Sequence, residues 1–173
     1  MIKTTTVFLL LGGNLGDRAK IIQNALLEIG EHIGRITAQS LVYETAAWGV
    51  TDQPAFFNQV VQVETPLLPE ALLDVIHRIE ASAGRVRHDK WQARILDIDI
   101  LFYGDEIIGL PGLTVPHPEL HNRRFTLVPL VQIAPRFVHP VSKKTAEQLL
   151  AQCPDQLEVR AVSGADWFKN DSE

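Results

Sequence analysis

The sequence predicts an α+β fold of the ferredoxin-like type, a βαββαβ sandwich with additional C-terminal strands and helices. The first observation is the order of the apolar patterns over residues 5–102, which run strand, helix, strand, strand, helix, strand. The second is size, because 173 residues, 46% of them hydrophobic, suit one compact domain spanning residues 1–173. No internal repeat or interdomain linker divides the chain.

The first half of the chain supplies three strands and one helix. Thr5–Leu11 is a short apolar run ended by two glycines, the pattern of a buried strand. Asp17 is a candidate N-cap for the helix that follows, where apolar residues recur at helical spacing. Ile36–Tyr43 and Phe57–Glu64 predict two further strands. The connection between them, Glu44–Phe56, is too long for a tight hairpin, and loops of this length are often functional.

The second half begins with a helix and the clearest strand. Pro69 suits the first turn of a helix that should stop at Gly84, and Ile95–Phe102 predicts the strand after it. The remaining chain is less regular. There we expect a short strand, a short helix interrupted near Pro129, a second helix, an edge strand and a frayed polar tail: Leu113–Val115, Phe125–Ile133, Ala146–Gln152, Leu157–Val162 and Gly164–Glu173.

Charge and cysteine content narrow the function classes. The chain has 16 Lys and Arg against 21 Asp and Glu, a net charge of −5, which disfavours nucleic acid and anionic membranes as partners. Cys153 is the single cysteine, so neither an internal disulfide nor a multi-cysteine zinc cluster can form. The apolar run Val7–Leu11 is too short for the core of a signal peptide. We therefore expect a cytoplasmic protein that binds neither membrane nor nucleic acid.

Two aspartates carry the strongest chemical signal. Asp97 and Asp99 are two residues apart in the predicted strand Ile95–Phe102, so both point to the same face, with Cα atoms about 6–7 Å apart. Ile98 and Ile100 point the other way, into the core. A divalent cation relieves the repulsion between two such carboxylates, and magnesium is typically held by one or two carboxylates, phosphate oxygens and water. The alternative is an exposed sheet face whose aspartates pair with Arg or Lys.

Basic residues gather directly before this strand. Residues 85–94 have a net charge of +3, which leaves −8 on the rest of the chain: Arg85, Arg87, Lys90 and Arg94 against Asp89. Guanidinium groups match phosphate oxygens in shape and charge, so a cationic loop beside a carboxylate pair suits a metal-bound polyphosphate. The alternative for this loop is a solvated surface run.

The turn Gly12-Gly13-Asn14-Leu15-Gly16-Asp17 is a weaker signal. It lacks the Gly-Lys-Ser/Thr of a P-loop and the full dinucleotide-binding glycine pattern. We interpret it as a tight connection between a strand and a helix. The chemistry of the residues thus points to phosphoryl transfer without naming a substrate.

The stretch Gly84–Tyr103 resembles the signature of the 6-hydroxymethyl-7,8-dihydropterin pyrophosphokinase family. Its core is Arg94-Ile95-Leu96-Asp97-Ile98-Asp99-Ile100-Leu101. Other stretches agree in the family's order, over roughly residues 5–140: the Gly-Gly-Asn-Leu-Gly-Asp turn, Tyr43-Glu44-Thr45, Asp52-Gln53-Pro54, Phe57-Asn58, Gly84-Arg85-Val86-Arg87, Thr114-Val115-Pro116-His117 and Asn122-Arg123-Arg124-Phe125. The family fold is a ferredoxin-like sandwich with extra C-terminal elements, which matches the predicted order.

The resemblance implies a diphosphokinase of folate biosynthesis. Such enzymes transfer pyrophosphate from ATP to the hydroxymethyl oxygen of 6-hydroxymethyl-7,8-dihydropterin and release AMP. The resemblance further implies that Asp97 and Asp99 hold two magnesium ions that bridge the ATP phosphates. Arg85 and Arg94 would be catalytic residues on a loop that closes over the triphosphate, with Arg87 nearby. Phosphoryl transfer relies on positioning and electrostatics, so we assign no strong general base.

The resemblance also implies two sets of ligand contacts. A flat heterocycle needs aromatic faces and a fixed donor–acceptor pair, and the implied pterin contacts are Thr45, Trp48, Phe56, Asn58, Trp91 and Phe125. The implied ATP contacts are Glu80, Arg87, Arg94, Ile100, Thr114, His117 and Arg123, with Ile100 acting through its backbone.

Two other functions remain open from the sequence. A palm-type metal-dependent nucleotidyltransferase would use the same Asp-x-Asp pair, but it predicts a nucleic-acid cleft that the acidic balance does not favour. The other is a non-catalytic ferredoxin-like binding module, for RNA or a small ligand. The RNA-binding version should carry aromatic residues on its central strands, and that pattern is missing. The resemblance suggests a monomer or weak homodimer. Because the chain ends shortly after the matched stretches, we expect no fused downstream folate enzyme.

Overall fold

The computed structural model describes residues 2–46, 54–84 and 95–162. Within these residues, six strands form one antiparallel sheet of order β5-β1-β4-β3-β8, in which β2 also pairs with β4. The six strands are β1 Thr5–Gly13, β2 Arg35–Gln39, β3 Tyr43–Thr45, β4 Phe56–Thr65, β5 Asp97–Tyr103 and β8 Arg160–Ala161. A separate hairpin is formed by β6 Ile108–Leu110 and β7 Leu113–Val115.

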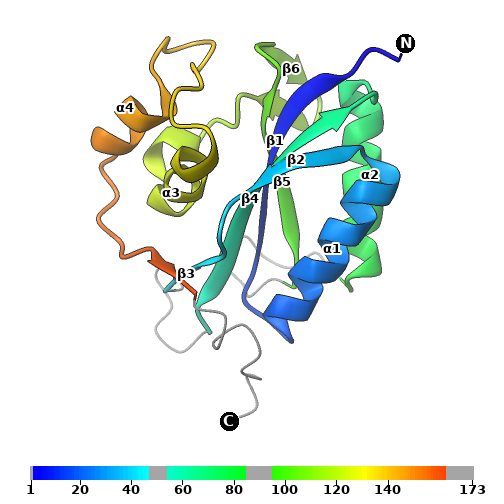
Figure 1. Cartoon of the computed structure of the whole chain (residues 1–173), viewed down its shortest axis with the longest axis horizontal. Helices are drawn as coiled ribbons and strands as arrows, with labels where there is room; N and C mark the ends of the chain where they lie inside the picture. Colours follow the sequence, from blue (N-terminus) through cyan, green and yellow to red (C-terminus); the bar gives the residue numbers. More distant parts are fainter. Residues whose placement is uncertain (1, 47–53, 85–94, 163–173) are drawn as a thin grey trace.

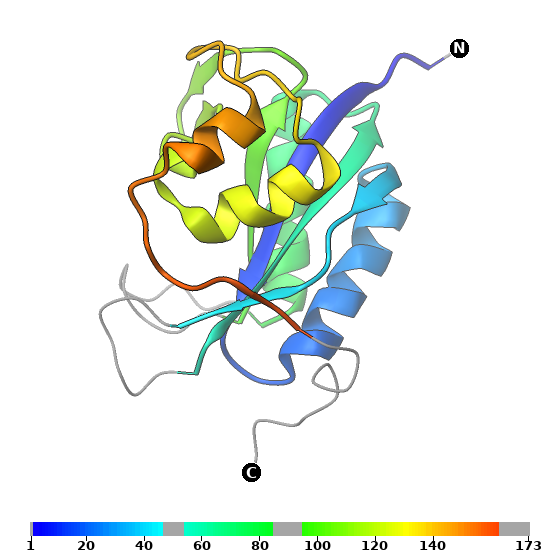
Figure 2. The same ribbon diagram turned by 60° about the vertical axis from the view of Figure 1, so that its left-hand side comes forward.

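Helices cover both faces of this sheet. They are α1 Arg18–His32, α2 Pro69–Ser82, the 3-10 turn η1 Leu120–Asn122, α3 Arg124–Ile133 and α4 Ala146–Ala151. Figure 1 shows α1 and α2 on one face and α3 and α4 on the other, and Figure 2 shows α3 and α4 from their own side. In the described segments, no helix has the length and apolar character needed to span a bilayer.

Local sequence explains where the first two helices begin and end. The Asp17 carboxylate accepts a hydrogen bond from the Lys20 backbone N–H at 3.2 Å, which confirms it as the N-cap of α1. Pro69 occupies the first position of α2, as predicted, because the N–H that it lacks would have no partner there. Gly84 follows the end of α2 with φ +90°, a conformation that favours glycine.

The central strand β1 divides the core into two layers. Val7, Leu9 and Leu11 pack toward α1 and α2, whereas Phe8 and Leu10 pack toward α3 and α4. All five are almost completely buried. Since successive residues of a strand alternate between faces, a continuous apolar run is what a strand covered on both sides requires.

The predicted α+β class is confirmed, and two strand assignments need correction. The single strand predicted at Ile36–Tyr43 is two strands, β2 and β3. The break falls at Ser40, whose Oγ accepts the Val60 N–H at 3.0 Å while its own N–H donates to the Val60 carbonyl. The strand predicted at Leu157–Val162 contracts to β8, which does lie at the edge of the sheet.

The later elements also differ from expectation in part. The helix predicted at Phe125–Ile133 is not interrupted, because α3 runs through Pro129. Pro129 has no N–H for the Phe125 carbonyl, and burial of Leu127 and Leu130 on either side stabilises the helix despite that loss. The strand β6, which pairs with the correctly predicted β7, was not expected. The tail Gly164–Glu173 lies outside the described residues.

His139 joins the C-terminal layer to the sheet. Its ring packs edge-on against Phe102 of β5 at a centroid distance of 5.6 Å. Its Nδ1 accepts the backbone N–H groups of Val141 and Ser142, both at 3.2 Å. The imidazole therefore closes the turn between α3 and α4. Burial, and to a lesser extent the charge of His121, lowers the pKa of His139 below its ordinary 6.5.

Acidification should therefore destabilise the fold through His139. A lowered pKa in the folded state means that unfolding takes up a proton, so stability present above about pH 6.5 is lost as the pH falls below it. Urea unfolding measures the free energy of unfolding at about pH 7.5 and at about pH 5.5. The decrease between the two should be smaller for His139→Asn, which keeps an acceptor for the turn, than for the wild type. His32→Asn, at an exposed site, is the control. An equal loss in His139→Asn and wild type would contradict this assignment.

Candidate functional site

The sheet register brings polar residues from three strands, β5, β4 and β3, into one row with Gly12 of β1. Asp97 of β5 pairs with Gly12 of β1, Gly12 pairs with Asn58 of β4, and Asn58 pairs with Tyr43 of β3. Directly paired residues point to the same face, so the row lies on the side of α3 and α4. Gly12 has no side chain, and a Cβ there would collide with the Asn58 Oδ1. Because Gly12 has no side chain, the Asn58 amide can lie over it, on the side toward Asp97.

The neighbouring rows complete this face. Asp99 pairs with Leu10, so it points to the same side as Asp97, as the sequence predicts. Phe56 pairs with Thr45 on the other flank of Asn58. Asp97, Asp99 and Phe56 are half-buried, whereas Asn58 is 4% exposed and Thr45 3% exposed. The structure therefore brings two carboxylates, an amide, a hydroxyl and an aromatic ring onto one surface.

Helix α3 covers only part of that surface. Leu127 and Leu130 of α3 pack over Leu10 and Val60, and the Tyr43 hydroxyl donates to Gln132 Oε1 at 2.8 Å. The half-buried ring of Phe125, in the first turn of α3, packs against the same layer. Phe125 therefore belongs to the layer that packs on the same face of the sheet as Asn58 and Asp97.

Glu80 reaches the carboxylate-bearing strand from the opposite face. It belongs to α2, is 3% exposed, and its Oε2 accepts the backbone N–H of Ile98 at 2.9 Å. Ile98 is the residue between the two aspartates, so Glu80 fixes the outer edge of β5 where the pair is presented. Ile100 is 5% exposed and its side chain lies in the core. Its side chain is therefore not available to a ligand, and a contact through the backbone stays a prediction.

His117 and Arg123 lie beside the second aspartate. The His117 backbone N–H donates to the Leu101 carbonyl at 3.0 Å, which attaches it to β5. Burial lowers the pKa of His117, and the negative field of Asp99 opposes that effect. The Arg123 guanidinium lies 5.8 Å from the centre of the Phe125 ring. Thr114, in β7, is exposed to solvent.

Five of the predicted site residues cannot be placed. Trp48, Arg85, Arg87, Trp91 and Arg94 lie outside the described residues. The structure therefore bears on the carboxylate, amide and hydroxyl parts of the prediction, and not on the cationic loop.

The turn between β1 and α1 contributes more than the simple connection that we predicted. The buried Asn14 donates through Nδ2 to the Pro54 carbonyl at 3.1 Å. Arg18 donates through Nη1 to the Ala55 carbonyl at 2.7 Å, and its guanidinium lies 3.9 Å from the centre of the Phe57 ring. Together they hold the start of β4, directly before Phe56. The motif was visible in the sequence, but its partners about 40 residues away were not.

The donor set fits a hard divalent cation. Asp97 and Asp99 offer carboxylate oxygens on one face, and the Asn58 amide oxygen lies over Gly12 in the same row as Asp97. Magnesium typically accepts one or two protein carboxylates and takes its other ligands from phosphates and water. Among the described residues, no three or more His, Cys, Asp or Glu side chains are grouped so that they could hold a metal on their own.

Comparison with known families and proteins gives one consistent result. Residues 8–135 match the family model described as 7,8-dihydro-6-hydroxymethylpterin-pyrophosphokinase (HPPK). The chain is 43% identical over 143 residues to the 2-amino-4-hydroxy-6-hydroxymethyldihydropteridine pyrophosphokinase of Aquifex aeolicus, covering 83% of this chain and 89% of that protein. It is 40% identical over 156 residues to the protein of the same name from Haemophilus influenzae, covering 90% and 97%.

The fold is also shared with solved structures. A crystal structure of Plasmodium falciparum HPPK-DHPS superposes with a TM-score of 0.70 at 20% sequence identity. The match covers 87% of this chain but 42% of the Plasmodium chain. This similarity therefore concerns the fold of one part of that larger protein.

Gly12→Ala should destabilise the protein, because the new methyl group must displace the Asn58 amide. We expect a loss of about 1–3 kcal/mol in the free energy of unfolding, the usual range for overpacking a core. Chemical denaturation measures it. Gly109→Ala is the matched control, since Gly109 is also in a strand and a Cβ there would have no atom within 4 Å. Equal stability of the two variants would show that the space over Gly12 is not restricted.

Proposed function

The chain belongs to the 7,8-dihydro-6-hydroxymethylpterin-pyrophosphokinase family, and we propose that it transfers pyrophosphate from ATP to the hydroxymethyl oxygen of 6-hydroxymethyl-7,8-dihydropterin. The products of this reaction are AMP and the pterin diphosphate, an intermediate of folate biosynthesis. The observation that carries the proposal is the shared face of Asp97, Asp99, Asn58 and Thr45. It sets metal-binding oxygens beside groups that can recognise a polar heterocycle.

Asp97 and Asp99 are the residues that would hold magnesium, and we propose two ions. When bound, the ions would offset the negative charge on the triphosphate oxygens. The contribution of the chain is to present both carboxylates from one rigid strand, whose edge is held by Glu80. This rigidity supports the proposal, because phosphoryl transfer depends on positioning more than on proton transfer.

The pterin contacts are proposed on the other side of Gly12. The Thr45 hydroxyl is buried and lacks a hydrogen-bond partner among the described residues, which is costly unless a ligand or another group pairs with it. The Asn58 amide offers a donor and an acceptor to the edge of the ring. Phe56 and Phe125, both half-buried, are proposed to contact its faces, and Trp48 and Trp91 are proposed as further contacts.

The nucleotide contacts are proposed along the outer edge of β5. His117 and Arg123 lie there beside Asp99, and the exposed Thr114 lies in β7, which contacts β5. Ile100 would contribute its backbone, and Glu80 would act by holding β5. The remaining contacts are proposed for the three arginines of the cationic loop, Arg85, Arg87 and Arg94, of which Arg85 and Arg94 are the proposed catalytic residues.

Several broader assignments are part of the proposal. The strand order β5-β1-β4 with β2 beside β4, and α1 and α2 on one face, supports a ferredoxin-like classification. We propose that residues 1–173 form one catalytic domain that acts in the cytoplasm as a monomer or weak homodimer. No nucleic-acid partner is proposed, in keeping with the net charge of −5.

The purified protein should release AMP and the pterin diphosphate when given Mg²⁺, ATP and 6-hydroxymethyl-7,8-dihydropterin. Separation of the nucleotides by chromatography measures the reaction. AMP should appear only when both the pterin and the metal are present. ADP as the product, or AMP formed without pterin, would overturn the proposal.

Asp97→Ala should lower kcat by roughly 10²-fold or more, because it removes a ligand of the metal whose charge stabilises the transition state. The fold should persist, since Asp97 is the first residue of β5 and is only half-buried. Circular dichroism and urea unfolding check the fold, and Asp105→Ala, in the turn after β5, is the control. Normal turnover by Asp97→Ala would remove the carboxylate pair from the mechanism.

Arg18→Met should raise the KM for the pterin by about fivefold or more, the equivalent of one hydrogen bond. The substitution keeps an apolar stem but removes the bond to Ala55 and the stacking on Phe57, so the start of β4 that carries Phe56 and Asn58 is less restrained. The KM for ATP should not change. Lys20→Met, at an exposed site of α1, is the control, and Arg18→Lys should restore part of the loss. Equal effects on both KM values would indicate general destabilisation instead.

A further inference from the structure

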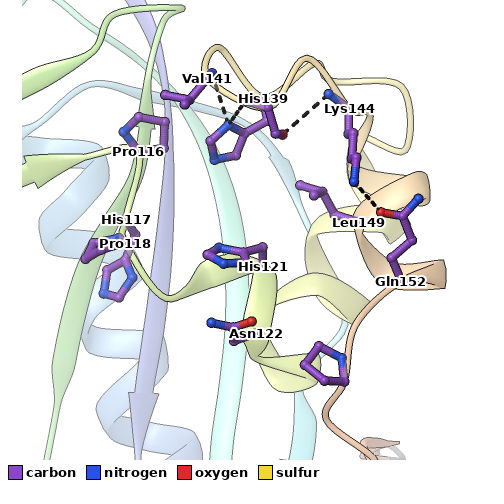
Figure 3. A pocket seen from close by; sticks show the side chains of 12 residues that line it. Pro116, His117, Pro118, His121, Asn122, His139, Val141, Lys144, Leu149 and Gln152 are labelled. Carbon is purple, nitrogen blue, oxygen red and sulfur yellow. Dashed lines mark hydrogen bonds between the residues drawn. The ribbon is translucent and has the colours of Figure 1, made fainter.

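A cavity lies where η1, α4 and the turn closed by His139 meet (Figure 3). Its volume is about 380 Å³, within the range of small-molecule sites. The lining residues are Pro116, His117, Pro118, His121, Asn122, His139, Val141, Ser142, Lys144, Leu149, Gln152 and Pro154. Neither Asp97 nor Asp99 is among them.

We propose that this cavity is a second binding site, for a small molecule that carries a phosphate group. The lining holds three imidazoles and one ammonium group, and none of these lining residues is Asp or Glu. Such a set supplies hydrogen-bond donors from several directions, together with the positive charge of Lys144, and a tetrahedral oxyanion can accept from all of them. Three prolines, Val141 and Leu149 form apolar walls that suit an organic body attached to the phosphate. The cavity shares His117 with the proposed nucleotide contacts, whereas His139 and Lys144, on which the proposal mainly rests, are not among those contacts.

His139 carries the strongest part of the argument. It is 9% exposed, and its Nδ1 accepts two backbone N–H groups at 3.2 Å, so in the neutral ring the proton is on Nε2. In Figure 3 one edge of the His139 ring faces the turn that contains Val141, and the opposite edge faces the cavity. Within the described part of the chain, Nε2 has no acceptor. The Nε2–H is therefore available to a ligand or to water in the cavity.

Two other residues repeat this arrangement. The His117 Nδ1 accepts the Glu119 N–H at 3.2 Å, so its neutral ring also keeps the proton on Nε2. Lys144 Nζ donates to Gln152 Oε1 at 2.6 Å, which uses one of its three donors and holds the ammonium group at the cavity (Figure 3). Three side chains from two segments of the chain are therefore fixed by other bonds while keeping donors for a ligand.

Charge decides between an anion and a cation as the occupant. Burial, and to a lesser extent the charge of His121, lowers the pKa of His139, so the ring contributes a neutral Nε2–H donor and Lys144 contributes the charge. Lys144 would repel a cation. A bound phosphate would instead pair with Lys144 and with the Nε2–H of His139.

The test uses the full-length chain labelled with ¹⁵N-histidine, without divalent cations so that the proposed magnesium site is not filled. Inorganic pyrophosphate and AMP are titrated separately while the Nε2 resonance of His139 is followed. At least one should cause a saturable shift. If both compounds saturate the shift and AMP binds with the higher affinity, the apolar walls contact the organic part of the ligand. If only pyrophosphate saturates it, the site binds the free anion.

Two neighbouring lysines provide matched variants. Lys144→Met should weaken binding seen at His139 by about tenfold, as expected for a lost charged hydrogen bond. Lys143→Met, which removes an exposed charge next to it, should leave the affinity unchanged. His139→Asn, which keeps an acceptor for the turn, should weaken binding measured by calorimetry. No saturable shift with either compound, or equal effects of the two lysine variants, would overturn the proposal.

Discussion

The register of β1 against both of its neighbours is the constraint on which the site depends. Gly12 pairs with Asp97 on one side and with Asn58 on the other, so one residue determines which groups of β4 and β5 share a row. A shift of one residue in either pairing would turn the carboxylates or the amide toward α1 and α2. That register is fixed by burial, because Phe8 and Leu10 fit one layer and Leu9 and Leu11 the other. The core therefore positions the polar row without contacting a ligand.

Residues behind the sheet hold the residues in front of it. The Glu80 carboxylate accepts the N–H of Ile98, which lies between the two aspartates, and Arg18 donates to the carbonyl of Ala55, which precedes β4. Both come from the α1 and α2 side, whereas the row over Gly12 faces α3 and α4. A hydrogen bond to a backbone group restrains the strand itself, so it also restrains the direction of the side chains on the face toward α3 and α4. The site thus needs both layers of the protein.

The sequence was sufficient for those parts of the protein that depend on local spacing. The helices α1 and α2, the strand carrying Asp97 and Asp99, and the shared face of that pair follow from period and capping residues alone. Contacts between distant segments could not be predicted in this way. The bonds from Asn14 and Arg18 to residues 54 and 55 depend on how β1, α1 and β4 pack, and the motif that contains Asn14 looked like a simple connection. The uninterrupted helix through Pro129 likewise depends on burial, which overrides a local preference.

The distribution of charge likewise depends on how distant segments pack, and not on the composition of the chain. A net charge of −5 describes an acidic protein, but the average says little about a site, because electrostatic interactions act over short distances in salt solution. Beside β5 the character of the surface changes over a short distance, from the carboxylate of Asp99 to His117 and Arg123, and then to the cavity that is lined by His117 and Lys144. The carboxylates are suited to a cation and the donors next to them to phosphate oxygens. A metal-bound phosphate compound satisfies both at once, and neither half of the surface would be favourable for such a ligand without the other.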